Sequence, residues 1–188
     1  MIKNTKYNNP KIYYIHGYQS SPDGHKGVLF KNKLQAKVIK YRNCEPEDLI
    51  ITSCLQQIYH EIKDDKNVIL IGSSLGGFLA ASTAFKNNKV KKIILLNPAI
   101  IPPHFDLDKL KDIPRSISED MINPTLFEDK IDAEVIILRG TEDEVIPDSW
   151  VVEFAKAQEA TVMFLHDDHR FSRYLKQLPS IISKLLKN

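Results

Sequence analysis

Residues 68–77 read VILIGSSLGG, a short aliphatic run that ends in two adjacent serines with glycines on either side. The continuous apolar run is typical of a strand buried on both faces of a sheet. Small residues directly after it allow a sharp turn, and the residues from Leu75 to Phe85 read as a helix. The stretch therefore predicts a strand, a tight turn and a helix in immediate succession.

The same alternation of strand and helix continues along the chain. Aliphatic runs predict strands over residues 11–15, 36–41, 67–71, 91–96, 134–139 and 161–166, and longer amphipathic stretches predict helices over 21–34, 49–62, 75–85, 148–158 and 171–186. We expect the last helix to bend at Pro179. This order is typical of an α/β fold. We expect one domain over residues 1–188, a three-layer αβα sandwich around a mostly parallel sheet of about six strands.

The composition argues against several classes of function. The 26 basic residues nearly balance the 24 acidic ones, and we find no basic stripe interleaved with aromatic residues that would suit nucleic acid. No segment is apolar over the length that spans a bilayer, and residues 1–10, MIKNTKYNNP, lack the apolar core of a signal peptide. We therefore expect a cytoplasmic protein that binds neither nucleic acid nor a membrane.

In open parallel sheets the ligand site lies beyond the carboxyl ends of the strands. Ser74 stands there, at the centre of a G-x-S-x-G pattern made with Gly72 and Gly76. The sharp turn of such a pattern lifts the central side chain above the sheet, at the start of a helix whose N–H groups favour negative charge. We predict Ser74 as a nucleophile and Ser73 as a turn serine that hydrogen-bonds locally.

The end of the first predicted strand supplies a second element of this site. Gly17 lets the chain turn there, so that the backbone N–H of Tyr18 points into the crevice. Together with the N–H of Leu75, which follows the predicted nucleophile, it would form an oxyanion hole with two donors. We expect His16 to be hydrogen-bonded within this loop rather than to transfer protons.

The loops after the last two predicted strands carry a candidate acid and a candidate base. Asp143 lies just before its loop turns apolar, where a carboxylate is held inward, whereas Glu142 and Glu144 are expected to be solvated. His169 lies further along its loop than His166 and can reach across the sheet to a serine. The acids and histidines of that loop match no familiar metal-ligand spacing, so we expect neither a metal nor a cofactor.

With its order of serine, acid and histidine, the chain resembles the α/β-hydrolases, and specifically the small, nearly lidless YqiA-like esterases. The resemblance covers almost the whole chain and is carried by YIHGYQSSPDGHK (14–26), LIGSSLGGFLA (70–80), LLNPAI (95–100), GTEDEVIP (140–147) and DHRF (168–171). It implies six parallel strands in the order 4-3-5-6-7-8 of the larger family, whose two leading strands are missing here. The chain departs from the pattern at His166-Asp167, where such esterases have a glycine pair.

The resemblance implies Ser74 as nucleophile, His169 as base, Asp143 as acid, and a carboxylesterase that cleaves small short-acyl esters through an acyl-enzyme. Four prolines break residues 100–132 into pieces too short for a full lid, so we expect an open site. A thioesterase or an amidase with the same triad remains an alternative. So does a non-catalytic binding protein built on the same fold.

Overall fold

The computed structural model describes residues 10–187, in which six strands form one sheet in the order β2-β1-β3-β4-β5-β6. The strands are β1 (Lys11–Ile15), β2 (Lys37–Val38), β3 (Val68–Ser73), β4 (Val90–Leu96), β5 (Glu134–Gly140) and β6 (Thr161–Leu165). Every neighbouring pair is parallel. The predicted α/β class and the implied strand order are confirmed.

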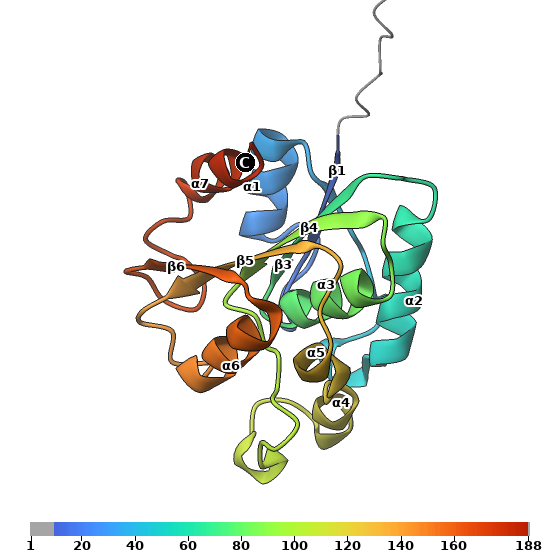
Figure 1. Cartoon of the computed structure of the whole chain (residues 1–188), viewed down its shortest axis with the longest axis vertical. Coiled ribbons are helices and arrows are strands. Elements are labelled where there is room, and N and C mark those ends of the chain that lie inside the picture. The colour runs from blue at the N-terminus through green and yellow to red at the C-terminus, as the bar shows by residue number, and fades with distance from the viewer. Residues whose placement is uncertain (1–9, 188) are drawn as a thin grey trace, which may run out of the picture.

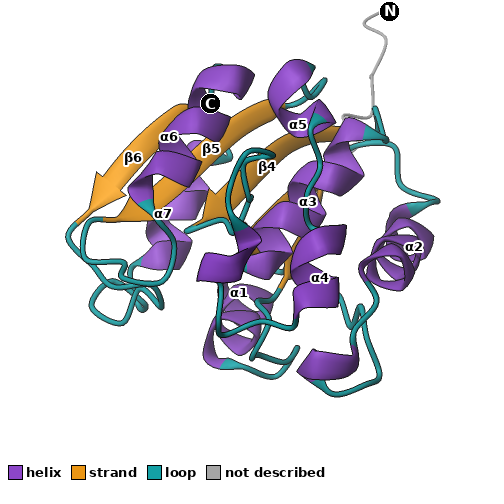
Figure 2. Ribbon diagram, turned by 90° about the horizontal axis from the view of Figure 1, so that it is seen from below, coloured by secondary structure: helices purple, strands orange, loops and turns teal. Residues whose placement is uncertain are grey.

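Helices cover both faces of the sheet, as Figures 1 and 2 show. They are α1 (His25–Leu34), α2 (Ile51–Ile62), α3 (Leu75–Phe85), α4 (Arg115–Asp120), α5 (Thr125–Glu128), α6 (Asp148–Gln158) and α7 (Leu178–Leu185), with short 3₁₀ turns η1 (Pro46–Asp48) and η2 (Leu107–Lys109). Helices α1 and α7 lie on one face, and α2, α3 and α6 lie on the other (Figure 1). Two buried apolar clusters fill the spaces between these layers.

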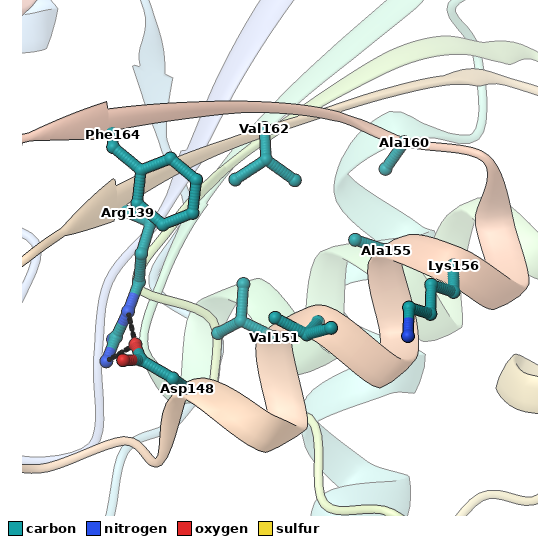
Figure 3. Close-up of a pocket in the computed structure, with 9 residues that line it drawn as sticks. Arg139, Asp148, Val151, Ala155, Lys156, Ala160, Val162 and Phe164 are labelled. Carbon is teal, nitrogen blue, oxygen red and sulfur yellow. Dashed lines mark hydrogen bonds and ion pairs between the residues drawn. The ribbon is translucent and has the colours of Figure 1, made fainter.

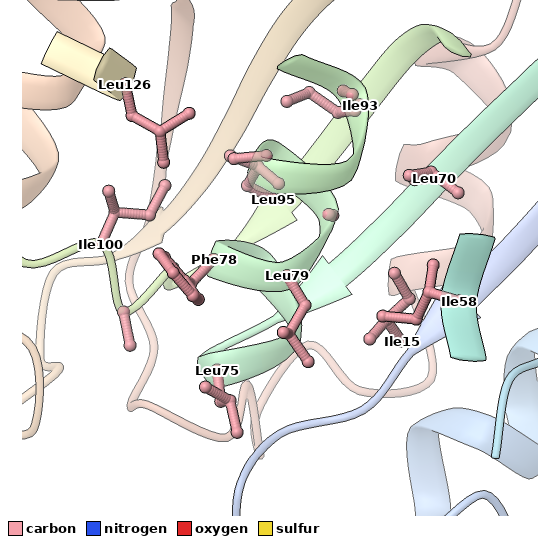
Figure 4. Close-up of a cluster of buried hydrophobic side chains, with 14 of the residues drawn as sticks. Ile15, Ile58, Leu70, Leu75, Phe78, Leu79, Ile93, Leu95, Ile100 and Leu126 are labelled. Carbon is pink, nitrogen blue, oxygen red and sulfur yellow. The ribbon is translucent and has the colours of Figure 1, made fainter. Parts of the chain in front are cut away.

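The chain after β4 packs down onto helix α3. Nearly every residue of α3 is buried, and Ile100 and Leu126 lie beside its Phe78 (Figure 4). Ile117 and Met121 of this excursion are each only 2 % exposed. Residues 100–132 therefore contain short helices whose apolar side chains pack into the core.

Two predicted elements near the N-terminus are shorter than expected. The predicted strand 36–41 pairs with β1 only at Lys37 and Val38, because Tyr41 instead packs beside the loop after β1 and donates to the Gly17 carbonyl at 3.3 Å. The predicted helix 21–34 begins at His25. Its first residues form a turn instead, closed by a hydrogen bond from the Gly24 N–H to the Ser21 carbonyl at 3.1 Å.

The last helix was predicted too long. It begins at Leu178 rather than at residue 171, and Pro179 lies in its first turn instead of bending its middle. Proline is favoured there because the first turn needs no backbone donor. Residues 169–174 form turns instead of a helix. Phe171 within them is fully buried and has a φ of 57°.

Two predictions concern residues at the ends of the chain. The lack of a signal peptide in residues 1–10 and the outer limits of the single domain fall largely on residues 1–9 and 188, which lie outside the described residues. Between these ends, no helix has both the length and the apolar character that a membrane span requires.

His16 follows β1 and is buried, as the sequence predicts, in a hydrogen-bonded loop. Its ring stacks on Tyr41 with centroids 4.4 Å apart, and its Nδ1 lies 2.9 Å from the Gly17 carbonyl oxygen. Burial lowers the pKa of His16 from 6.5 to about 4; the bond to Gly17 opposes this shift and the charge of Arg42 adds to it. The ring is therefore neutral at neutral pH.

The burial of His16 makes stability sensitive to acid. In the unfolded chain the ring takes up a proton near pH 6.5, whereas in the folded chain it does so only near pH 4. The free energy of unfolding should therefore fall as the pH drops from 6.5 toward 4, by up to about 3 kcal/mol. Urea unfolding at about pH 7.5 and about pH 5 measures this loss.

His16→Phe is the control, because phenylalanine can keep the stack on Tyr41 without a titratable ring. Other ionisable groups act alike in both proteins, so the difference between their unfolding free energies should change with pH. An unchanged difference across this range would contradict the assignment.

Candidate active site

Ser74 occupies a strained backbone position between β3 and α3. Its φ of 54° and ψ of −120° are values that residues other than glycine rarely adopt. Its N–H donates to the Leu96 carbonyl at 3.0 Å, and its carbonyl accepts from the N–H groups of Gly77 at 2.8 Å and Ala99 at 3.0 Å. These bonds hold the sharp turn between strand and helix that the G-x-S-x-G pattern predicts.

Gly72 and Gly76 leave room for this turn. A Cβ atom on Gly76 would lie 2.1 Å from the Ile15 carbonyl oxygen and 2.6 Å from that of His16. A Cβ atom on Gly72 would lie 2.3 Å from the Gly76 carbonyl oxygen. Only glycine therefore allows the start of α3 to lie so close to the ends of β1 and β3.

The loop after β1 lies against Ser74. The point where a Cβ atom of Gly17 would stand is 3.3 Å from Ser74 Cβ and 3.9 Å from Ser74 Oγ. The Gly17 carbonyl oxygen is held by His16 Nδ1 at 2.9 Å and by the Tyr41 hydroxyl at 3.3 Å. The peptide that joins Gly17 to Tyr18 is thereby fixed in orientation next to the serine.

Two backbone donors near Ser74 are free. A trans peptide directs its N–H opposite to its carbonyl, so the Tyr18 N–H points away from the groups that hold the Gly17 carbonyl. The Leu75 N–H belongs to the first residue of α3, where no helical acceptor exists. Over residues 10–187, neither N–H has a hydrogen-bond acceptor. Both predicted oxyanion donors are thus available.

Asp143 presents a buried carboxylate to His169. The Asp143 side chain is 0 % exposed, and its Oδ2 lies 2.9 Å from His169 Nδ1. Its Oδ1 accepts the N–H groups of Val145 at 2.8 Å and Ile146 at 3.1 Å. Burial alone would raise the pKa of Asp143, but His169 and these two N–H groups outweigh it and hold the pKa below its usual value. The carboxylate is therefore ionised at neutral pH.

Arg139 balances the charge of this carboxylate through the same oxygen, Oδ2, that His169 contacts. Its Nη1 lies 2.5 Å from Asp143 Oδ2, its Nε donates to Asp148 at 2.8 Å, and its Nη2 donates to the Ile146 carbonyl at 2.7 Å. The guanidinium is 3 % exposed. Arg139 and Asp148 also border a surface hollow of about 280 Å³ between α6 and β6 (Figure 3), whose other lining residues are Val151, Val152, Ala155, Lys156, Ala160, Val162 and Phe164.

The loop that carries His169 is built around two aspartates. Asp167 is 1 % exposed, and its carboxylate accepts the N–H groups of Asp168, Arg173 and Tyr174. The Asp168 carboxylate accepts those of Arg170 and Ser172. The loop thus has acceptors for its own backbone, and the His169 side chain remains 20 % exposed.

The neighbouring serine, histidine and acid that were not predicted as triad residues have other partners or face solvent. Ser73 is buried, and its side chain is hydrogen-bonded to the Tyr14 hydroxyl across the sheet rather than within the turn. His166 is exposed and lies 3.3 Å from Glu142 at the surface. Glu144 is exposed, as predicted.

The structure brings Asp143 and His169 into contact and places Ser74 at the same edge of the sheet. Within the described residues, no hydrogen bond joins Ser74 to His169. Two buried polar residues of this edge, Asn97 and Arg139, were not predicted as site residues. Asn97 directly follows strand β4 and Arg139 lies near the end of strand β5, and a buried polar side chain in such a place needs partners. The sequence carries that signal, but the partners of Asn97 belong to segments distant in sequence.

Comparison with solved structures finds the same fold elsewhere. Est1E from Butyrivibrio proteoclasticus is similar with a TM-score of 0.76 and 19 % identity, over 98 % of this chain and 89 % of that one. Alpha/beta hydrolase domain-containing protein 10 from mouse gives a TM-score of 0.75 and 20 % identity, over 95 % and 90 % of the two chains. The fold is therefore that of the α/β-hydrolases.

Sequence comparison covers almost the same length. A UPF0227 protein from Shewanella woodyi is 26 % identical over 179 residues, which are 90 % of this chain and 96 % of that protein. The model of one family, described as Uncharacterised protein family (UPF0227), matches residues 11–186. The chain belongs to the UPF0227 family.

Proposed function

We propose that this protein is a serine hydrolase that cleaves small carboxylic esters, with Ser74, His169 and Asp143 as its catalytic triad. The observation that carries this proposal is the 2.9 Å contact between Asp143 and His169, which come from different loops at the edge where Ser74 lies. A strained serine, a histidine on a buried carboxylate and two free N–H groups are together the parts that acyl transfer needs.

In the proposed reaction, His169 accepts the hydroxyl proton of Ser74 on Nε2 while the serine oxygen attacks the ester carbonyl carbon. The Asp143 carboxylate accepts a hydrogen bond from Nδ1–H of His169, which keeps Nε2 free for the serine proton and stabilises the imidazolium. His169 then returns the proton to the departing alcohol, and the acyl group stays on Ser74. His169 then deprotonates a water molecule, whose oxygen attacks the acyl carbon. The bond to Ser74 breaks, His169 returns the proton to the serine oxygen, and the carboxylic acid departs.

The negative charge of each tetrahedral intermediate would lie on the former carbonyl oxygen. The free N–H groups of Tyr18 and Leu75 can donate to it, and one such donor contributes about 3 kcal/mol to the barrier reduction. The missing bond between Ser74 and His169 is compatible with this mechanism, because catalytic hydrogen bonds are often loose before substrate binds.

The packing of residues 100–132 supports a short acyl group. Met121 is 2 % exposed within the core, and Phe105 packs edge-on against Trp150 with centroids 4.8 Å apart. Both side chains of the 100–132 segment are thus occupied with packing rather than forming a wall for a long chain. A small ester in an open site fits this arrangement.

A fluorophosphonate probe tests the nucleophile. We expect the wild type to be labelled and Ser74→Ala to be unlabelled, with ester hydrolysis reduced by roughly 10⁴-fold or more. Ser74→Ala should keep its melting temperature, because in the described part of the chain the Ser74 hydroxyl makes no hydrogen bond that the change would remove.

Ser73→Ala is the matched control, since it makes the same change one residue away, on a side chain bonded to Tyr14. It should be labelled and should hydrolyse esters. An unlabelled wild type, or equal labelling of Ser74→Ala, would exclude the serine hydrolase and favour a non-catalytic binding protein.

A panel of acyl substrates tests the predicted substrate class. We expect a higher kcat/KM for acetyl and butyryl p-nitrophenyl esters than for the palmitoyl ester, because the Met121 and Phe105 side chains are occupied with packing and form no wall for a long chain. The same panel includes an acyl-CoA thioester and an acyl anilide, which would react faster if the triad serves a thioesterase or an amidase. Preference for palmitoyl would show that the open-site interpretation is wrong.

A further inference from the structure

The last residue of β4 and the three residues after it, Leu96–Ala99, touch all three segments that carry the proposed triad. We call these four residues the β4 bracket. Its first and last residues hold the backbone of Ser74, through the Leu96 carbonyl and the Ala99 N–H, each at 3.0 Å. Its second residue, Asn97, reaches the other two segments.

The Asn97 side chain joins the loop that carries His169 to strand β5, which precedes the loop of Asp143. Its Nδ2 donates to the carbonyl oxygens of Asp168 at 3.2 Å and His169 at 3.1 Å. Its Oδ1 accepts the Gly140 N–H at 2.8 Å and lies 3.4 Å from Arg139 Nη1. Asn97 is 0 % exposed, so these bonds replace all contact with water.

These bonds close a ring around the acid and the base. From Asn97 the ring passes through the His169 backbone to its imidazole, then to Asp143, to Arg139 and back to Asn97. Its members come from the end of β4, from β5 and the loop after it, and from the loop after β6. A displacement of the His169 loop must therefore break the bonds of Asn97.

The donors and acceptors around this closed ring of hydrogen bonds explain why an amide side chain suits position 97. Two carbonyl oxygens require a double donor, and the Gly140 N–H with the guanidinium requires an acceptor on the same short side chain. Asparagine supplies both. It also tolerates the φ of 44° at Asn97 better than most residues do.

We propose that Asn97 is a positioning residue of the triad, which holds the imidazole of His169 at the correct place between Asp143 and Ser74. This inference rests on the proposed function. Asn97 acts through His169 and touches neither substrate nor the reacting atoms. Its loss should therefore lower kcat and leave KM nearly unchanged.

Asn97→Asp tests the donor group of the side chain separately from its acceptor group. Aspartate keeps an acceptor for Gly140 and Arg139, but it presents oxygen instead of N–H to the carbonyl oxygens of Asp168 and His169. We expect kcat for a short ester to fall about 10²-fold, as for a misplacement of about 1 Å, with KM within about threefold.

Two further variants control for stability. Asn87 is another buried asparagine whose Oδ1 accepts a backbone N–H, from Lys89, so Asn87→Asp makes the same chemical change at the opposite edge of the sheet. It should leave kcat unchanged. Asn97→Gly removes the bonds without repulsion and suits a positive φ, so it should lower kcat even if Asn97→Asp folds poorly.

A double-mutant cycle separates a positioning role from a structural one. If Asn97 acts through His169, then Asn97→Asp should cause no further loss of rate in a His169→Ala background. An equal loss in both backgrounds, or wild-type kcat in both Asn97 variants, would overturn the proposal.

Proton NMR makes the test independent of hydrolysis. The Nδ1 proton shared by His169 and Asp143 should give a low-field resonance that disappears in His169→Ala. We expect it to shift or broaden in Asn97→Asp and Asn97→Gly and to persist in Asn87→Asp. If the wild type cleaves no ester but the resonance behaves in this way, the proposed function fails and the role of Asn97 stands. An unaltered resonance in both Asn97 variants refutes that role.

Discussion

The turn at Ser74 depends on backbone hydrogen bonds to the end of β4. A φ of 54° and a ψ of −120° are unfavourable for a serine backbone, so hydrogen bonds from neighbouring residues must hold it in this conformation. The Leu96 carbonyl and the Ala99 N–H do this from one side, and the Gly77 N–H does so from within α3. The strained turn is thus part of the sheet, and its geometry follows from the position of β4 between β3 and β5.

The close packing around α3 makes this arrangement stiff. The helix is buried on almost all sides by β1, β3, β4, α2 and the segment after β4, which Figure 4 shows around Leu75, Phe78 and Leu79. Gly76 brings its first turn against the end of β1, so the same contact that buries the helix sets Gly17 beside Ser74. Packing and the predicted oxyanion hole are therefore consequences of a single close approach.

Features with a local signal could be predicted from the sequence. The aliphatic runs predicted the six strands. The G-x-S-x-G pattern distinguished Ser74, its central residue, from the adjacent Ser73. The segment before α7 shows where local reasoning fails. Its helical pattern is real, but the Asp167 carboxylate binds the N–H groups of Arg173 and Tyr174, and a turn competes with the helix.

Asn97 and Arg139 were missed as site residues for a related reason. Both are single polar residues at strand ends. Apart from Asn97, the partners of Arg139 follow it within nine residues, but several acids stand there and the sequence does not show which of them it binds. The partners of Asn97 lie 42 to 72 residues further along the chain, and only the strand order β3-β4-β5-β6 brings them to one edge. The positions of Asp143 and His169 on their loops were readable, whereas the side chains that fix those loops were not.

The acid and the base of the proposed triad are restrained in different ways. The Asp143 carboxylate is fully buried and contacts Val145, Ile146, His169 and Arg139, so its own contacts hold it in place. The imidazole of His169 is 20 % exposed and, over residues 10–187, hydrogen-bonds with that carboxylate alone. A ring held at one atom can still pivot when its backbone moves. The position of Nε2 relative to Ser74 is therefore set by the backbone of the His169 loop. Asp167 and Asp168 hold this backbone from within the loop, and Asn97 holds it from the end of β4.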